Sequence, residues 1–90
     1  MTGKCVLELG CGPGLASIVA AKLGAYRVLA TDGDKGSVAL AASNIDLNLC
    51  NRNRTGNQVI AQHFLWGEAA SFGFFEGRSI DFIIASDVRI

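Results

Sequence analysis

The sequence has few of the residues that build disulfide frameworks or metal sites. Its 90 residues include three cysteines, one histidine and one proline. Cys5, Cys11 and Cys50 are odd in number and contain no C-x-x-C pair, so neither a disulfide framework nor a zinc site is expected. Reduced thiols are typical of intracellular proteins. We therefore expect a cytoplasmic protein without a metal.

The sequence also lacks long apolar runs and an excess of charge. No apolar run approaches the roughly 18 residues that span a bilayer, and the N-terminus has no apolar core of a signal peptide. Lys plus Arg and Asp plus Glu are 8 each, which argues against a nucleic-acid or membrane-surface partner. Half of the residues are hydrophobic and only 18% are charged, which excludes intrinsic disorder. Such a short apolar chain is one domain at most, and we expect it to lack some of its packing partners.

Short apolar runs alternate with helical patterns along the chain. Strands are predicted over Cys5–Leu9, Arg27–Thr31, Gln58–His63 and Ile80–Ala85. The first helix is predicted to turn Leu15, Ile18, Val19 and Leu23 to one face and to end at Gly24. The second is predicted to turn Val38, Ala41, Ala42, Ile45 and Leu49 to one face. Glu68–Phe75 is either a short helix or a loop. The order β-α-β-α-β-(α)-β predicts an α/β fold, a Rossmann-like doubly wound parallel sheet with strand order 3-2-1-4.

The glycine-rich run Gly10–Gly14 (GCGPG) follows the first predicted strand. No Gly-Lys-Ser/Thr occurs in the chain, so a P-loop is excluded. The G-x-G-x-x-G pattern of dinucleotide folds fails as well, because its third glycine would fall on Leu15. Glu8 stands two residues before Gly10, where a carboxylate would repel a pyrophosphate at the helix N-terminus. The loop therefore favours a ligand with positive charge.

Other chemistry-bearing residues fall at the carboxyl ends of the predicted strands, where the ligands of such sheets bind. Asp32 is placed to accept hydrogen bonds from ribose hydroxyls, and Trp66 offers a flat face to an adenine. Asp87 adds negative charge. S-adenosylmethionine has an ammonium group, a sulfonium, a ribose and an adenine, and it fits this set. NAD binding and a ligand-free structural role remain the alternatives.

Several segments resemble class I (seven-stranded) S-adenosylmethionine-dependent methyltransferases. The run VLELGCGPGLASIVAAKLGA resembles their first motif, and VLATDGDKGSVALAASNIDLN resembles the second motif of eukaryotic protein-lysine methyltransferases. Leu65–Glu68 (LWGE) and Asp81–Val88 (DFIIASDV) resemble further segments of that group. The sequence departs from the group at Leu65 and Ile90, where an aspartate and a tyrosine are usual.

The resemblance implies a role for each matching residue. Gly10, Cys11 and Gly12 would contact the methionine part of the cofactor through their backbone, and Glu8 its amino group. Asp32 would hold the ribose and Trp66 the adenine, with Ser86 along the cofactor. Asp87, at the mouth of the substrate channel, would orient the acceptor amine and is the catalytic candidate.

The resemblance implies an enzyme that transfers a methyl group to a lysine side chain of a protein. A class I methyltransferase acting on a small molecule or another nucleophile is the alternative, as is a catalytically inactive cofactor-binding remnant. Residues 1–90 would be the N-terminal, cofactor-binding half of the domain. The fourth predicted strand would then be an apolar edge, which invites self-association.

Overall fold

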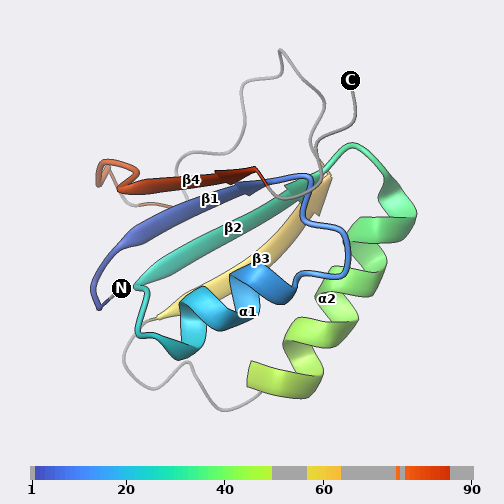
Figure 1. Ribbon diagram of the computed structural model, residues 1–90, viewed down its shortest axis with the longest axis horizontal. Helices are drawn as coiled ribbons and strands as arrows, with labels where there is room; N and C mark the ends of the chain where they lie inside the picture. The colour runs from blue at the N-terminus through green and yellow to red at the C-terminus, as the bar shows by residue number, and fades with distance from the viewer. Residues whose placement is uncertain (1, 50–56, 64–74, 76, 86–90) are drawn as a thin grey trace.

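The computed structural model describes residues 2–49, 57–63, 75 and 77–85. Within them the elements run β1 (Cys5–Leu9), α1 (Leu15–Lys22), β2 (Arg27–Asp32), α2 (Lys35–Leu49), β3 (Gln58–His63) and β4 (Phe82–Ala85). The four strands form one parallel sheet in the order β3-β2-β1-β4, as Figure 1 shows. The predicted α/β fold and strand order are confirmed.

Both helices pack on one face of the sheet. Ala20 of α1 contacts Val6 and Val28, while Ile45 of α2 packs with α1 against Val59. The opposite face carries a second cluster, formed by Cys5, Leu7, Leu29 and Phe75. Alternate side chains of β1 therefore point to opposite faces of the sheet. The side chain of Glu8 lies on the face that the helices cover, as that of Val6 does.

The predicted apolar face of α1 is wrong. Leu15, Val19 and Leu23 are exposed, whereas Ile18 is buried as predicted. Ser17, Ala20 and Ala21 face the sheet instead, because small side chains let the helix lie close to the strands. The expected helix end is confirmed. Gly24 adopts φ 95° and its amide bonds to the carbonyl of Ala21, while the amide of Ala25 reaches the carbonyl of Ala20, which is a Schellman motif.

The predicted face of α2 is confirmed at Ala41, Ile45 and Leu49, which are buried, while Ala42 is exposed. β1 and β3 have the predicted bounds, and β2 is one residue longer. β4 begins at Phe82 instead of Ile80, because Asp81 turns both its amide and its carboxylate to the backbone of Cys5, each at 2.8 Å. Of the segment Glu68–Phe75, only Phe75 is among the described residues.

Candidate functional site

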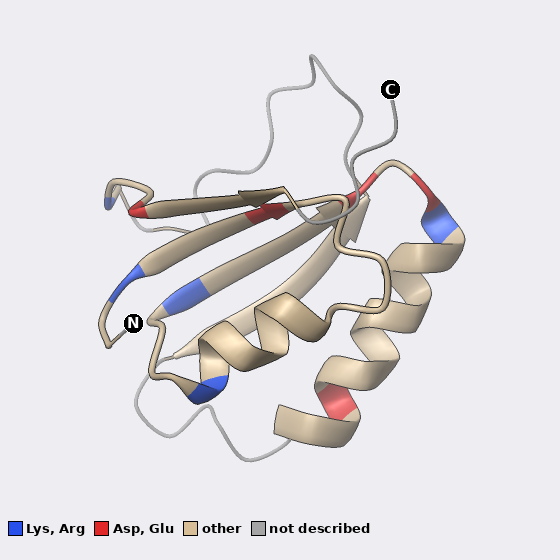
Figure 2. Ribbon diagram, in the orientation of Figure 1, with Lys and Arg blue, Asp and Glu red and all other residues tan. Residues whose placement is uncertain are grey.

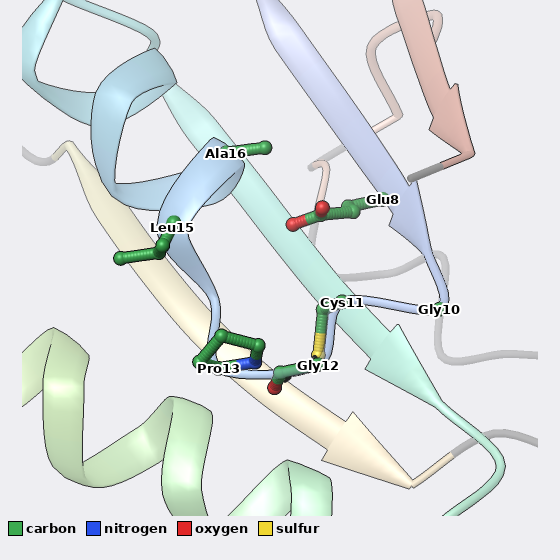
Figure 3. Close-up of a pocket in the computed structure, with 7 residues that line it drawn as sticks. All are labelled: Glu8, Gly10, Cys11, Gly12, Pro13, Leu15 and Ala16. Carbon is green, nitrogen blue, oxygen red and sulfur yellow. Dashed lines mark hydrogen bonds between the residues drawn. The ribbon is translucent and has the colours of Figure 1, made fainter. Parts of the chain in front are cut away.

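The loop Gly10–Gly14 joins β1 to α1 at the carboxyl edge of the sheet. It borders a pocket of about 270 Å³, which is drawn in Figure 3. The residues that line it are Glu8, Gly10, Cys11, Gly12, Pro13, Leu15 and Ala16. Ligand pockets usually measure roughly 300–1,000 Å³. The pocket is therefore large enough for part of a cofactor, such as an amino-acid moiety.

Three backbone amides of this loop donate hydrogen bonds to oxygen atoms of the chain itself. The amide of Cys11 donates to the carbonyl of Thr31 at 2.8 Å, and that of Gly14 donates to the carbonyl of Cys11 at 2.9 Å. The amide of Gly12 donates to Oδ2 of Asp32 at 3.0 Å. A loop that binds phosphate instead turns such amides toward the ligand. The hydrogen bonding is thus unlike that of a pyrophosphate cradle.

Helix α2 packs against the glycine loop and supports it. Gly14 adopts φ 86°, and a Cβ atom on it would lie 3.1 Å from the Cβ of Ala41. Only glycine meets both the backbone conformation and this close approach. The Nδ2 atom of Asn44 donates to the carbonyl of Pro13 at 2.8 Å. Residues of α2 therefore fix the position of the loop.

Glu8 is the one charged residue among those that line the pocket. Figure 3 shows its carboxylate pointing from β1 toward the beginning of α1. The side chain is 0% exposed, and its Oε1 atom accepts a hydrogen bond from Oγ of Ser17 at 2.5 Å. A carboxylate beneath the loop acts on a ligand mainly through its charge.

Asp32 connects the glycine loop to the turn that follows β2. Its Oδ2 atom accepts from Gly12, as described, and its Oδ1 atom accepts from the amide of Asp34 at 2.9 Å. His63, at the end of β3, lies against the same turn, with Nε2 3.1 Å from the carbonyl oxygen of Gly33. Ser37 donates from its amide and its hydroxyl to Oδ2 of Asp34, and these bonds hold the pKa of Asp34 below its usual value. The carboxylate of Asp32 is thereby fixed at the carboxyl edge of the sheet.

The thiol of Cys11 reports the electrostatic character of this edge. Burial raises its pKa from 9.0 to about 11, and the negative charges of Glu8 and Asp32 add to the rise. Two carboxylates that disfavour a thiolate between them favour a cation in the same place. The site is therefore suited to positive charge.

The structure brings five predicted residues together. Glu8, Gly10, Cys11 and Gly12 line the pocket, and Asp32 is bonded to Gly12. The other three predicted site residues lie outside the described part of the chain; they are Trp66, Ser86 and Asp87.

Sequence reasoning missed Ser17 and the role of Asn44. The signal for Ser17 was available, because it is the one polar residue between Leu15 and Ala21 in a helix that faces a sheet. Asn44 lies within the run that resembles the second motif of the protein-lysine methyltransferases, but its bond to Pro13 depends on the tertiary structure.

Two negative findings apply to the described residues. No group of three or more His, Cys, Asp or Glu side chains among them could hold a metal ion. Neither of their helices is long and apolar enough to cross a membrane.

Comparison with known proteins gives matches to methyltransferases. The chain is 38% identical over 93 residues to methyltransferase-like protein 23 of Dictyostelium discoideum, covering 94% of this chain and 37% of that protein. It is 52% identical over 46 residues to ribosomal protein L11 methyltransferase of Syntrophomonas wolfei, covering 51% of this chain. The chain spans only 15% of that enzyme.

A solved structure shows the same likeness. The ribosomal protein L11 methylase of Lactobacillus delbrueckii subsp. bulgaricus superposes with a TM-score of 0.53 at 36% sequence identity. The match covers 64% of this chain and 27% of that one. The lysine methyltransferase family matches residues 1–89, which is nearly the whole sequence. This chain therefore belongs to the lysine methyltransferase family.

Proposed function

We propose that this chain binds S-adenosylmethionine and is part of an enzyme that methylates a lysine side chain of a protein. One observation carries the cofactor assignment. The amides of Cys11, Gly12 and Gly14 donate hydrogen bonds to oxygens of the chain, while the carboxylates of Glu8 and Asp32 flank the loop. This arrangement favours an ammonium, a sulfonium and sugar hydroxyls over the pyrophosphate of NAD.

Different residues would bind different parts of the cofactor. The pocket above Glu8 would take the methionine part, with Gly10, Cys11 and Gly12 along it. Asp32 would accept hydrogen bonds from the ribose hydroxyls. Three further roles are proposed from the sequence alone. Trp66 would contact the adenine, and Ser86 would lie along the cofactor. Asp87 would orient the acceptor amine.

When bound, the cofactor supplies an electrophilic methyl group whose bond to sulfur breaks as a neutral lysine nitrogen attacks. The enzyme's task is therefore alignment and a complementary field. The negative edge formed by Glu8 and Asp32 stabilises the positive charge of the bound cofactor. A carboxylate at Asp87 would accept a hydrogen bond from the attacking amine and hold its lone pair toward the methyl group.

The family supports the lysine acceptor. Relatives are named for a ribosomal protein, which is consistent with a protein substrate. The proposal includes a cytoplasmic location, which the cysteine content of the sequence supports. A small-molecule acceptor and an inactive cofactor-binding remnant are the alternatives that the experiments below separate.

Calorimetric titration tests the cofactor assignment. The intact protein should bind S-adenosylmethionine and S-adenosylhomocysteine, and it should not bind NAD at the same concentrations. Binding of NAD, or of none of the three, would overturn the assignment.

Transfer of a labelled methyl group tests the acceptor. The protein is incubated with labelled cofactor and a cell extract, and acid-hydrolysed protein is analysed for methyllysine. Label in methyllysine supports the proposal. Label confined to small molecules favours the first alternative, and cofactor binding without any transfer favours the inactive remnant.

A further inference from the structure

Ser17 is a buried polar residue on the face of α1 that packs against the sheet. It is the third residue of the helix, and its exposed fraction is 0%. Its helical neighbours on that face are apolar, among them Ile18 and Ala21. A buried hydroxyl without a partner costs free energy, and this one is directed at Oε1 of Glu8, 2.5 Å away.

The surroundings of Glu8 explain what this contact does. Its neighbours across the sheet are Ala30 on β2 and Ile84 on β4, whose side chains are apolar. A glutamate side chain has three rotatable bonds, so its carboxylate can take several directions. The hydroxyl of Ser17 donates and the Oε1 atom of Glu8 accepts. The bond ties the carboxylate to the first turn of α1, under the glycine loop.

We propose that Ser17 is a positioning residue, which fixes the Glu8 carboxylate beneath the pocket so that its charge acts on the amino group of the bound cofactor. The inference rests on the proposed function, since it assigns the ligand group that Glu8 meets. Ser17 does not touch the cofactor. Its effect on binding passes through Glu8, and this property distinguishes it from a residue that only stabilises the fold.

Two ligands separate the amino-acid end of the cofactor from the rest. S-adenosylhomocysteine carries the amino acid, whereas 5′-methylthioadenosine retains the nucleoside and sulfur and lacks the amino group. We expect Ser17→Ala to weaken S-adenosylhomocysteine about tenfold, which is the effect of one hydrogen bond to a charged group. The affinity for 5′-methylthioadenosine should change by less than about twofold.

A double-mutant cycle supplies a readout that a purely structural role would not move. Glu8→Gln removes the charge and keeps the shape. In that background, Ser17→Ala should cause no further loss of S-adenosylhomocysteine affinity, because the group that it positions is gone. Ser17→Thr retains the hydroxyl and should keep most of the affinity.

Ser43 provides the matched control. It lies on α2, it is exposed, and it lies outside the pocket. Ser43→Ala should leave the affinity for both ligands unchanged. Urea unfolding of each variant establishes that it is folded, and if Ser17→Ala does not fold, the comparison of Ser17→Thr with the parent protein decides.

The outcomes are distinct. Selective loss of S-adenosylhomocysteine that vanishes in the Glu8→Gln background supports the inference. Equal loss of both ligands, no loss, or additive effects of the two substitutions would overturn it while leaving the proposed function intact. If Ser17→Ala does not fold, an equal loss of affinity for both ligands in Ser17→Thr overturns the inference. If the parent protein binds neither ligand, the proposed function fails, and the inference fails with it.

Discussion

The Oδ2 atom of Asp32 accepts the amide hydrogen of Gly12 at 3.0 Å, which joins the end of β2 to the loop after β1. The same carboxylate accepts from Asp34 through Oδ1. The residue proposed to hold the ribose therefore also shapes the loop proposed to hold the methionine part. Because one carboxylate serves both halves of the site, its loss should affect the whole ligand.

Asp32→Asn keeps the size of the side chain and removes its charge and one acceptor. We expect the affinity for S-adenosylhomocysteine to fall by about tenfold or more, as for the loss of a hydrogen bond to a charged group. Calorimetry measures the change. Asp46→Asn, on the exposed side of α2, is the matched control and should have no effect. Unchanged affinity of Asp32→Asn would contradict the assignment of this residue.

Gly14→Ala should destabilise the fold by about 2 kcal/mol or more, because left-handed backbone strain adds to the contact with Ala41. Gly77 has φ 75° and no atom within 4 Å of a Cβ built on it, so Gly77→Ala isolates the strain. That control should cost only about 1–2 kcal/mol. Urea unfolding gives both values, and equal losses would show that the approach to Ala41 is unimportant.

The thiol of Cys11 should make stability depend on pH in the alkaline range. Its pKa is raised to about 11 in the folded chain, whereas an unfolded cysteine titrates near its ordinary value of about 9. Below pH 9 the thiol is protonated in both states. Between pH 9 and 11 the unfolded chain loses the proton and the folded chain keeps it, so the free energy of unfolding falls.

Cys11→Ala removes this titration, so the difference between parent and variant isolates it from other groups. We expect the stability of the parent relative to the variant to decrease as the pH rises from 9 to 11, measured by urea unfolding in buffers of equal ionic strength. A difference that is constant over this range would show that the thiol titrates alike in both states.

Asn44→Ala should loosen the glycine loop, because it removes the hydrogen bond from α2 to the carbonyl of Pro13. We expect a loss of roughly threefold to tenfold in cofactor affinity and of about 1 kcal/mol in stability. Asn48→Ala is the matched control, since Asn48 bonds to the carbonyl of Asn44 within the same helix. A cofactor affinity that falls equally in both variants would argue against support of the loop by Asn44.

The 90-residue chain on its own should self-associate. β4 ends the described sheet, and Phe82 and Ile83 on it are 47% and 64% exposed. An exposed apolar edge strand pairs readily with another chain. Sedimentation velocity should show concentration-dependent association, and Ile83→Lys should reduce it. A monomer at all concentrations, with a cooperative melt at high temperature, would refute this expectation.

The sequence was sufficient for the sheet but not for the packing of α1. Each strand is an apolar run bounded by glycine or polar residues, and such local signals survive tertiary packing. Apolar periodicity placed Leu15 on the buried face, yet the helix turns small residues to the sheet. The sequence pattern predicts the buried face from hydrophobicity alone. In the structure the helix lies close to the sheet, and this close packing favours small side chains at the contact.

The site could be predicted in composition but not in its contacts. Glu8 and Asp32 follow from the loop pattern and from the strand ends, and Cys11 follows from the resemblance to the first methyltransferase motif. The bonds from Ser17 to Glu8 and from Asn44 to Pro13 join residues 9 and 31 positions apart, and they depend on how the helices pack. Such contacts leave no local pattern in the sequence.

The distribution of charge has a consequence for how this neutral chain meets other molecules. Among the described residues, positive charge prevails at the amino end of the strands and negative charge at the carboxyl end (Figure 2). The amino end carries Lys4, Lys22, Arg27, Arg78, Asp46 and Asp81. The carboxyl end carries Glu8, Asp32, Asp34 and Lys35. This part of the chain is thus an electric dipole along the strand direction. It should draw cations to the carboxyl end over about one Debye length, and added salt should slow their capture.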